Sequence, residues 1–538
     1  MGDFTRRYFL ETTALAAGAS ALPSAGALAQ ARPKYTRYNV TSEGGRKALA
    51  SYAKAVGIML RLPANDPHNW FRNAFVHFMD CPHGNWWFYV WHRGYLGFFE
   101  RTIRELSGDS SFAIPYWDWT QLPEIPGGMF DGVLTPADRA YEPFTFNLDV
   151  FTKFIQPTLT KYWDGLSGAQ HAQLDARGYK TFEAMWNDML AYDTVKQYAN
   201  AGNIAFAPTC SARYLTRSNP RLDEKTTYDV SPFVVTAGLL VTDFYNQEAG
   251  LSFNSTRTAS HNTAPTSSKQ FSTLEGMPHN KVHNYIGGVG PLNYGPYGNM
   301  TNNLSPVDPI FFLHHSNMDR LWDVWTRKQK AHGLDWRPAR DDAKTYFDEP
   351  FLFFVDAKGQ PVKDGKAADF FNMEVFDYAY EPGFGEDVVK PAAGAMAMAR
   401  GEVHAGSVSG NTGTLSLPQA ALNASAPPAM MEITVPPPSA ESGQKEFDVL
   451  ITLPGSTAKV YAGTIAFFGH MAGMTMPMNA TFSVPLPKAA QHPAPMLTAP
   501  KGGANAMAAR ASTALTVSVV PTGGGTAPAL KGLALTVR

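Results

Sequence analysis

The sequence predicts two folded regions, a mainly α-helical region with long loops and a smaller all-β region. Helical periodicity recurs before residue 385, as in Ser42 to Leu62 and Arg93 to Leu106. After residue 430, short β-branched runs stand between Pro and Gly residues, which is typical of a β-sandwich. With 538 residues, 44% of them hydrophobic, the chain is long enough to bury more than one core.

Composition excludes several classes of protein. Lys+Arg 45 against Asp+Glu 46 leaves a formal charge of −1, so the chain lacks the excess of cations that a nucleic-acid binder uses to neutralise phosphates. Beyond the N-terminus no apolar run is long enough to span a membrane. The two cysteines exclude a disulfide scaffold and a zinc module built on cysteine.

Residues 1–31 resemble an export signal rather than part of the fold. Arg6 and Arg7 are followed by Phe9-Leu10, then by an Ala-rich apolar stretch and a small-residue cleavage site at 27–29. This order is typical of a twin-arginine signal peptide, and it predicts a periplasmic or secreted protein. The alternative is an Ala-rich amphiphilic helix with two chance arginines.

The remaining chain is predicted to hold two domains joined by a linker. Residues 32–385 form the helical domain, and 386–429, rich in Ala, Gly, Ser and Pro, form the linker. Residues 430–538 form the β domain. Its expected strands are 446–452, 459–468, 480–484 and 513–520.

Seven of the 14 histidines fall in two windows: His77, His83 and His92, then His279, His283, His314 and His315. His279 and His283 are four residues apart, so on a helix both rings share a face and can bind one metal ion. His83 and His92 are nine apart and would face opposite ways on one helix, so His83 is expected in a loop before a helix that carries His92.

Asp308-Pro309 predicts the start of the last of these helices. His314 and His315 are adjacent and about 100° apart around it, so one of them faces the metal, and spacing alone leaves open which. Neither window offers an obvious carboxylate or thiolate set, and all-imidazole ligation suits copper or a single zinc ion. Two windows of three imidazoles favour two ions that share one site.

Two longer motifs are similar to the copper signatures of the tyrosinase and polyphenol oxidase family, the type 3 copper proteins. The first is His83-x4-Phe88-Tyr89-Val90-Trp91-His92-Arg93-x2-Leu96-x3-Glu100, and the second is Asp308-Pro309-Ile310-Phe311-Phe312-x2-His315-x3-Asp319. Lys445-Glu446-Phe447-Asp448-Val449 resembles a stretch of the C-terminal domain of plant polyphenol oxidases. The export signal indicates a bacterial member.

The resemblance implies an antiparallel four-helix bundle that holds two copper ions with O2 as co-substrate. The ligands implied are His77, His83 and His92 for the first ion and His279, His283 and His315 for the second. His77 has a rival in His68, because the family varies the distance to its first histidine. The motif also selects His315 over His314.

Further roles follow from the resemblance. Some members join a cysteine two residues before the second histidine to that ring, which makes a thioether between Cys81 and His83 the expectation. The alternatives are a buried thiol or a disulfide to Cys210. Arg93 and Asp319 are expected to pair with each other, or Asp319 to accept an imidazole N–H, and in either way to orient a ligand.

Glu275 matches a position where plant members have a Glu that holds a water, and Asn280 matches a position where the family associates Asn with monophenol hydroxylation. A water shared by the two side chains is expected to accept the phenolic proton. For Glu275 the alternative is a carboxylate that stabilises a helix N-terminus. Asn284 lies on the substrate side and is uncharged, so it gives no preference for carboxylated phenols. Trp87, Phe88, Trp91, Phe311 and Phe312 are expected in the core.

The function implied is ortho-hydroxylation of monophenols and oxidation of o-diphenols to o-quinones. A catechol oxidase limited to diphenols and a haemocyanin-like oxygen carrier are the alternatives. The β domain is a candidate shield over the site, with no residue identified as the plug, and a copper chaperone is a candidate partner. The segment 470–478, rich in His and Met, could bind Cu(I) or fill a β core, and the second interpretation is favoured.

Overall fold

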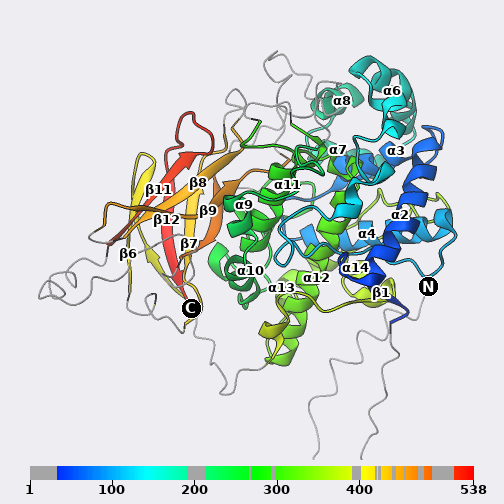
Figure 1. The fold of residues 1–538 in the computed structure, drawn as a ribbon. Helices are drawn as coiled ribbons and strands as arrows, with labels where there is room; N and C mark the ends of the chain where they lie inside the picture. The colour runs from blue at the N-terminus through cyan, green and yellow to red at the C-terminus, as the bar shows by residue number, and fades with distance from the viewer. Residues whose placement is uncertain are drawn as a thin grey trace, which may run out of the picture. The chain divides into compact units, whose positions relative to one another are not determined.

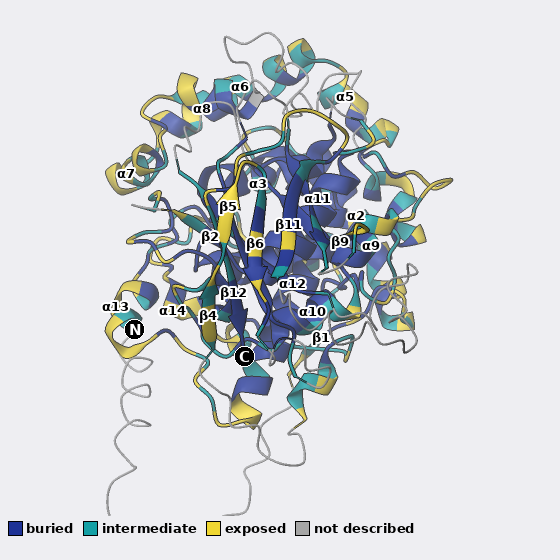
Figure 2. Cartoon of the chain, turned by 90° about the vertical axis from the view of Figure 1, so that its left-hand side faces the viewer, coloured by how far each residue is buried: buried dark blue, intermediate teal, exposed yellow. Residues whose placement is uncertain are grey.

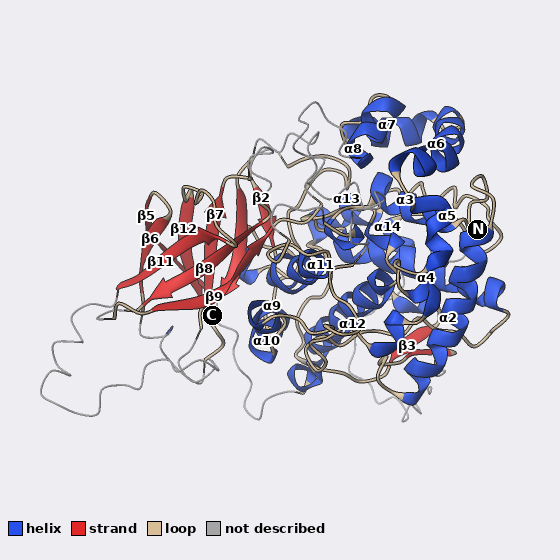
Figure 3. Ribbon diagram, turned by 45° about the horizontal axis from the view of Figure 1, so that its top comes forward, coloured by secondary structure: helices blue, strands red, loops and turns tan. Residues whose placement is uncertain are grey.

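Helices build the first part of the chain and strands the last part (Figure 3). This computed structural model describes residues 33–190, 213–265, 268–292, 297–390, 401–418, 421, 426–438, 444–453, 456–469, 478–487 and 514–538. The chain divides into two units, Met1–Lys34 and Tyr35–Arg538, and the elements below lie in the second. The predicted signal peptide at 1–31 lies outside the described residues. None of the described helices combines the length and apolarity needed to cross a bilayer.

The helical region carries thirteen described α-helices (Figure 1): α2 (Glu43–Arg61), α3 (Trp70–Asp80), α4 (Phe88–Ser107), α5 (Glu142–Thr145), α6 (Leu148–Asp164), α7 (Gly168–Ala176), α8 (Phe182–Leu190), α9 (Glu224–Asp229), α10 (Pro232–Leu239), α11 (Asn280–Ile286), α12 (Ile310–Ala331), α13 (Arg340–Phe347) and α14 (Ala367–Phe370). A π-turn, Glu275–His279, leads into α11. The predicted helix over 42–62 is confirmed as α2, where the Ser42 side chain accepts the Gly45 N–H at the N-cap. The short strands β1 (Tyr35–Arg37) and β3 (Tyr378–Tyr380) pair in parallel and join the two ends of this region.

Helices α4 and α12 form the centre of the helical region, and most of their residues are buried, as the dark blue around α12 in Figure 2 shows for that helix. Both helices also bury charged side chains, which pair with one another, as Arg93 does with Asp319 at 2.7 Å. Aromatic rings fill the space between these helices, and the Phe99 and Phe312 rings stack with centroids 3.6 Å apart. The predicted core aromatics Trp87, Trp91 and Phe311 are fully buried.

The strands form two five-stranded sheets, which confirms the predicted sandwich-like β region. Their order is β2-β10-β7-β12-β4 in one sheet and β5-β6-β11-β8-β9 in the other. The bounds are β2 (Lys269–Phe271), β4 (Glu402–Ala405), β5 (Ser407–Ser409), β6 (Thr412–Ser416), β7 (Met430–Val435), β8 (Glu446–Thr452), β9 (Lys459–Ala466), β10 (Ala480–Pro485), β11 (Ala514–Pro521) and β12 (Gly532–Val537). The four strands expected from the sequence correspond to β8, β9, β10 and β11.

The predicted linker over 386–429 is wrong for residues 402–416, which form β4, β5 and β6. β4 and β5 are edge strands, one in each sheet, and their side chains are mostly exposed. An edge strand buries little apolar surface, so its Gly, Ser and Thr residues read as a linker in the sequence. The β region therefore begins near residue 402 instead of 430.

The helical and β regions also share structure, so the predicted boundary between two domains is not a break. β2 comes from the helical region and pairs in parallel with β10, with Phe271 opposite Phe482. The second hydrophobic core includes Val234 and Met277 from the helical region. At the same junction Lys281 Nζ lies 2.5 Å from Glu446 Oε2, with both side chains fully buried.

Breaking this buried ion pair should destabilise the protein. Glu446→Gln leaves the Lys281 ammonium buried without its counter-charge, and we expect a loss of about 3 kcal/mol of unfolding free energy. The measurement is the urea midpoint followed by circular dichroism. The matched control is Glu43→Gln, which breaks an exposed pair of the same 2.5 Å length with Lys47 and should change little. Equal effects from the two variants would contradict the prediction.

Candidate metal centre

The six predicted ligands come from four helices, one loop and one π-turn. His77 lies on α3, His83 in the loop before α4, His92 on α4, His279 at the end of the π-turn, His283 on α11 and His315 on α12. The structure gathers them into two groups, and within each group the atoms able to bind a metal lie within 4.8 Å of one another. The groups are His77, Cys81, His83 and His92, and His279, His283, His314 and His315.

In four of the six rings a hydrogen bond fixes which nitrogen can bind a metal. Nδ1 donates to an oxygen in four rings: His77 to Asn303 O (2.7 Å), His92 to Phe88 O (2.7 Å), His279 to Asn280 Oδ1 (2.8 Å) and His283 to Met300 O (2.8 Å). An imidazole that donates from Nδ1 keeps its lone pair on Nε2. Burial lowers the pKa of His77 and of His279 to about 3, so both rings are neutral, as metal ligation requires.

The two groups of histidines adjoin each other. The His92 and His315 rings stack with centroids 4.0 Å apart, and His83 and His279 lie 5.8 Å apart. His283 Nε2 is 3.0 Å from His315 Nε2. Two metal ions held by these groups would therefore be neighbours in one site.

His314 and His315 differ in the nitrogen that they offer. Trp119 Nε1 donates a hydrogen bond to His314 Nδ1 at 3.1 Å. That bond leaves the proton of a neutral His314 ring on Nε2, so the ring has no lone pair directed at a metal. His315 has no such donor on Nε2 and faces His283 Nε2 instead. Trp119 thus fixes His314 in a tautomer unsuited to a metal, whereas no described partner holds His315 Nδ1, so the His315 ring can adopt either tautomer. This difference favours His315, as the motif does.

The rival His68 lies outside both groups, because its Nε2 is bonded to Asp356 O at 2.8 Å. Cys81 is a buried free thiol here, with Sγ 3.5 Å from His83 Nε2 and 3.3 Å from His92 Nε2. This proximity suits the predicted thioether, which stays a prediction. Cys210, the alternative disulfide partner, lies outside the described residues.

Glu275 reaches across to the loop that carries His83. Its Oε1 accepts the Gly84 N–H at 2.5 Å and its Oε2 accepts the Ser255 hydroxyl, so the carboxylate is not used at the N-terminus of its own helix. Burial raises the pKa of Glu275 to about 7, although both hydrogen bonds lower it. The site therefore holds a carboxyl group that exchanges its proton near neutral pH.

Asn280 and Asn284 are hydrogen-bonded to the last residue of β9 and to the residue that follows it. Asn280 Nδ2 donates to Ala466 O at 2.8 Å, while its Oδ1 accepts from the ligand ring of His279. Asn284 Nδ2 donates to Phe467 O at 3.2 Å. The residue after each of His279 and His283 is thus bonded to the β region.

Arg93 and Asp319 pair with each other at 2.7 Å, which decides between the two roles open for Asp319. Asp319 also accepts from Arg37 Nη1 at 3.1 Å and from the Tyr380 hydroxyl at 2.6 Å. These buried contacts join α4, which carries His92, to α12, which carries His315, and so fix the distance between two ligands.

Phe468 covers the histidines, a role that no sequence motif predicted. Its ring centroid lies 4.1 Å from that of His283, 4.7 Å from His83 and 5.5 Å from His279. The only local signal was its place at the end of the expected strand 459–468, beside the 470–478 segment. Residues 470–477 lie outside the described residues.

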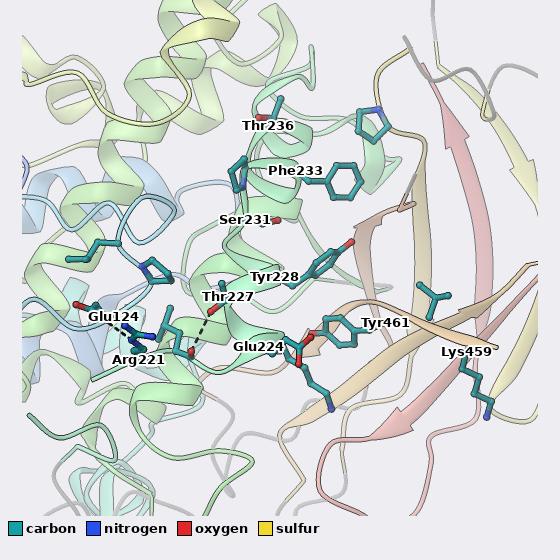
Figure 4. A pocket seen from close by; sticks show the side chains of 17 residues that line it. Glu124, Arg221, Glu224, Thr227, Tyr228, Ser231, Phe233, Thr236, Lys459 and Tyr461 are labelled. Atoms are coloured by element: carbon teal, nitrogen blue, oxygen red, sulfur yellow. Dashed lines mark hydrogen bonds and ion pairs between the residues drawn. The ribbon is translucent and has the colours of Figure 1, made fainter. Parts of the chain in front are cut away.

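A cavity of about 1160 Å³ lies between α9, α10 and β9 (Figure 4). Tyr228, Phe233 and Tyr461 line it, and no histidine or cysteine does among the described residues. It is separate from the two groups of histidines.

Comparison with known proteins agrees with the geometry. The common central domain of tyrosinase matches residues 50–328, about half of the chain. A polyphenol oxidase of Spinacia oleracea is 25% identical over 62% of this chain and 45% of its own length. A tyrosinase of a Hahella species, HcTyr1, is 25% identical over 66% of this chain and 65% of its own. The chain therefore belongs to the tyrosinase family, although it spans about half the length of several curated relatives.

Solved structures share the fold of both regions. A latent aurone synthase, a polyphenol oxidase, superposes with a TM-score of 0.53 at 17% identity and covers 95% of this chain and 90% of that one. Latent apple tyrosinase gives 0.52 at 18% identity, with 95% and 98% covered. The helical core with a C-terminal β region is thus an architecture that these proteins have in common.

The donor set fits the cofactor of this family. Copper in a type 3 centre takes imidazole nitrogens, and the two groups present such rings close together, all of them buried except His83, which is partly buried. The protein therefore has the dinuclear copper site of the tyrosinase family.

Copper content distinguishes the two adjacent histidines. We expect the wild-type protein to bind two copper ions per chain, His315→Ala to bind about one, and His314→Ala to retain two because its ring is held by Trp119. Atomic absorption on reconstituted, desalted protein measures the ratio. A loss of copper in His314→Ala with none in His315→Ala would reverse the assignment.

Proposed function

We propose that this protein hydroxylates monophenols at the ortho position and oxidises o-diphenols to o-quinones with O2. The observation that carries the proposal is the pair of adjoining imidazole groups beneath an aromatic ring, that of Phe468, because a phenol ring fits where Phe468 packs. His77, His83 and His92 would hold one copper ion and His279, His283 and His315 the other. Bound copper supplies the redox chemistry that passes electrons from the phenol to O2.

The protein's own groups exclude water and fix the rings. Phe88 packs 4.6 Å from His92 and Phe311 packs 4.2 Å from His315, measured between centroids. A dry site strengthens the interactions of the copper ions with their ligands and keeps reactive products from water. The fixed tautomers spare each ring any reorientation during the reaction.

Glu275 is the group placed to take the phenolic proton. Phenols ordinarily have a pKa near 10, so at neutral pH a base is needed to give the electron-rich phenolate. With its pKa raised to about 7, Glu275 is a better proton acceptor than an ordinary carboxylate. Asn280 would assist once its amide is released from Ala466. Export by the twin-arginine route and copper delivery by a chaperone complete the proposal.

Oxygen uptake with a monophenol and with a catechol tests the proposed reaction. Copper-loaded protein should consume O2 and form quinone from both. Quinone from catechol alone would indicate a catechol oxidase, and from neither an oxygen carrier. Metal-free protein serves as the control in each assay.

Glu275→Gln should lower the rate of monophenol hydroxylation about 100-fold and remove its rise with pH around pH 7. The sign follows from the carboxyl group, which accepts a proton only above its pKa. Ser255→Ala is the matched variant. It keeps the carboxylate but removes a hydrogen bond that stabilises the charged form, so the midpoint of the rise should move to higher pH. An unchanged pH profile in both variants would leave Glu275 without this role.

We also propose that the β region shields the site through Phe468. Its ring is 7% exposed and lies against rings of both groups, while Ala466 and Phe467 are hydrogen-bonded to Asn280 and Asn284. A phenol cannot occupy the same space.

Phe468→Ala should therefore raise catechol oxidation by the full chain about tenfold, since the substrate no longer has to displace the ring. Phe233→Ala, which removes an aromatic ring from the separate cavity at the same junction, is the control and should leave the rate unchanged. Initial rates of quinone formation measure both. Equal rates in Phe468→Ala and wild-type protein would show that the ring is no barrier.

A further inference from the structure

A cavity of about 370 Å³ opens beside the first group of histidines. Cys81, His83 and Phe468 line one side of it. The loop after α7, the segment 258–265 and strand β2 line the rest. A substituent on a ring that replaced Phe468 could extend into this space.

Two cationic side chains line this cavity, Arg177 and Lys269. Arg177 Nε donates to Asn262 Oδ1 at 2.8 Å and Nη1 donates to Cys81 O at 2.9 Å, while Nη2 is buried with no hydrogen-bond partner in the described part of the chain. Arg177 is thus held at the residue that touches His83, with donor capacity left over.

Lys269 is held at the same loop from strand β2. A Cβ atom on Gly84 would lie 2.0 Å from Lys269 Cε, so the lysine side chain packs directly on the residue after His83. Within the described residues the Lys269 amine has no ion-pair or hydrogen-bond partner. Burial lowers the pKa of Lys269 to about 8, which leaves most of the amine protonated at pH 7.

No described carboxylate lines the cavity. The charge of Glu275 acts on Lys269 and raises the pKa of its amine, but the Glu275 carboxylate is hydrogen-bonded to Gly84 and Ser255 and does not face the cavity. The lining residue His261 is held between Asp80 at 2.9 Å and Glu349 at 2.5 Å, and its charge is met there. The cavity beside the site is therefore positively charged.

We propose that Arg177 and Lys269 bind the carboxylate of phenolic acids and so make anionic phenols the preferred substrates. Arginine offers paired donors to a carboxylate and lysine adds a compact charge, and a partly desolvated pair of this kind binds more strongly than an exposed one. The inference rests on the proposed oxidation of phenols. It assigns charge selection to the His83 side of the site, away from Asn284.

The test compares 3-(3,4-dihydroxyphenyl)propionate with its primary amide, which has the same catechol and no charge. All chains are full length and carry Phe468→Ala, so that the ring position is open. The variants are Lys269→Met, Arg177→Met and Arg177→Lys. Arg177→Lys keeps the positive charge and serves as the second test if Arg177→Met fails to fold. Arg221→Met, which removes an exposed arginine in the separate cavity, is the matched control.

We expect kcat/KM to favour the carboxylate about tenfold, mainly through KM. Lys269→Met and Arg177→Met should each reduce this preference several-fold, Arg177→Lys should retain most of it, and Arg221→Met should not change it. Equal rates for acid and amide, or a preference that survives both methionine variants, would overturn the inference.

Calorimetric dissociation constants for the acid and the amide on the same chains, with and without copper, give a second readout. If neither compound is oxidised by any chain, the proposed function fails, and the ratio of dissociation constants then decides the inference alone. A ratio near one in the parent chain refutes it. A tenfold ratio lost in Lys269→Met supports it.

Discussion

The structure of this site depends on neutral imidazole rings that are held by a hydrogen bond at one nitrogen and direct the other nitrogen toward the site of the metal ions. A buried polar atom without a partner costs about 1–3 kcal/mol, and several ring nitrogens here have none among the described residues. Carbonyl groups such as Asn303 O and Met300 O hold the rings in place by accepting a hydrogen bond from the opposite nitrogen. Bound copper would offset the free-energy cost by coordinating the unpaired nitrogens. The dense aromatic packing of α4 and α12 and the contacts of Asp319 keep these rings from rotating out of place.

The β region belongs to the same site as well as to its own core. It contacts the residues that follow His279 and His283 through backbone carbonyls, and it inserts Phe468 between the two groups of rings. Backbone carbonyls accept the same amide donors whatever side chains the segment carries, so docking depends on the path of the chain after β9. The ring of Phe468 then occupies the space bounded by the rings of His83, His279 and His283.

The helices and most of the metal ligands could be predicted from the sequence, because periodicity, capping residues and residue spacing determine them locally. Helix α2 follows from its period and its Ser42 cap, and the position of His83 in a loop follows from its spacing to His92. The choice between His314 and His315 needed a motif, since the deciding partner, Trp119, is distant in the chain. Strands β4 and β5 were missed because edge strands carry little apolar signal. Phe468, Arg177 and Lys269 gain their roles only through contacts between distant segments, which no local pattern encodes.

Strand β2 links the shield to the rest of the site in a further way. It is only three residues long, and in this sheet its one strand partner is β10. A truncated protein that contained only the helical region would lack β10. The backbone N–H and C=O groups of β2 would then be unpaired and exposed, and unpaired strands of this kind promote self-association. Lys269 sits on this strand opposite Ala480, so the same cut would loosen the amine. Under the proposed function, a fully uncovered protein would admit bulky phenols more readily and would lose the proposed selection of anionic ones.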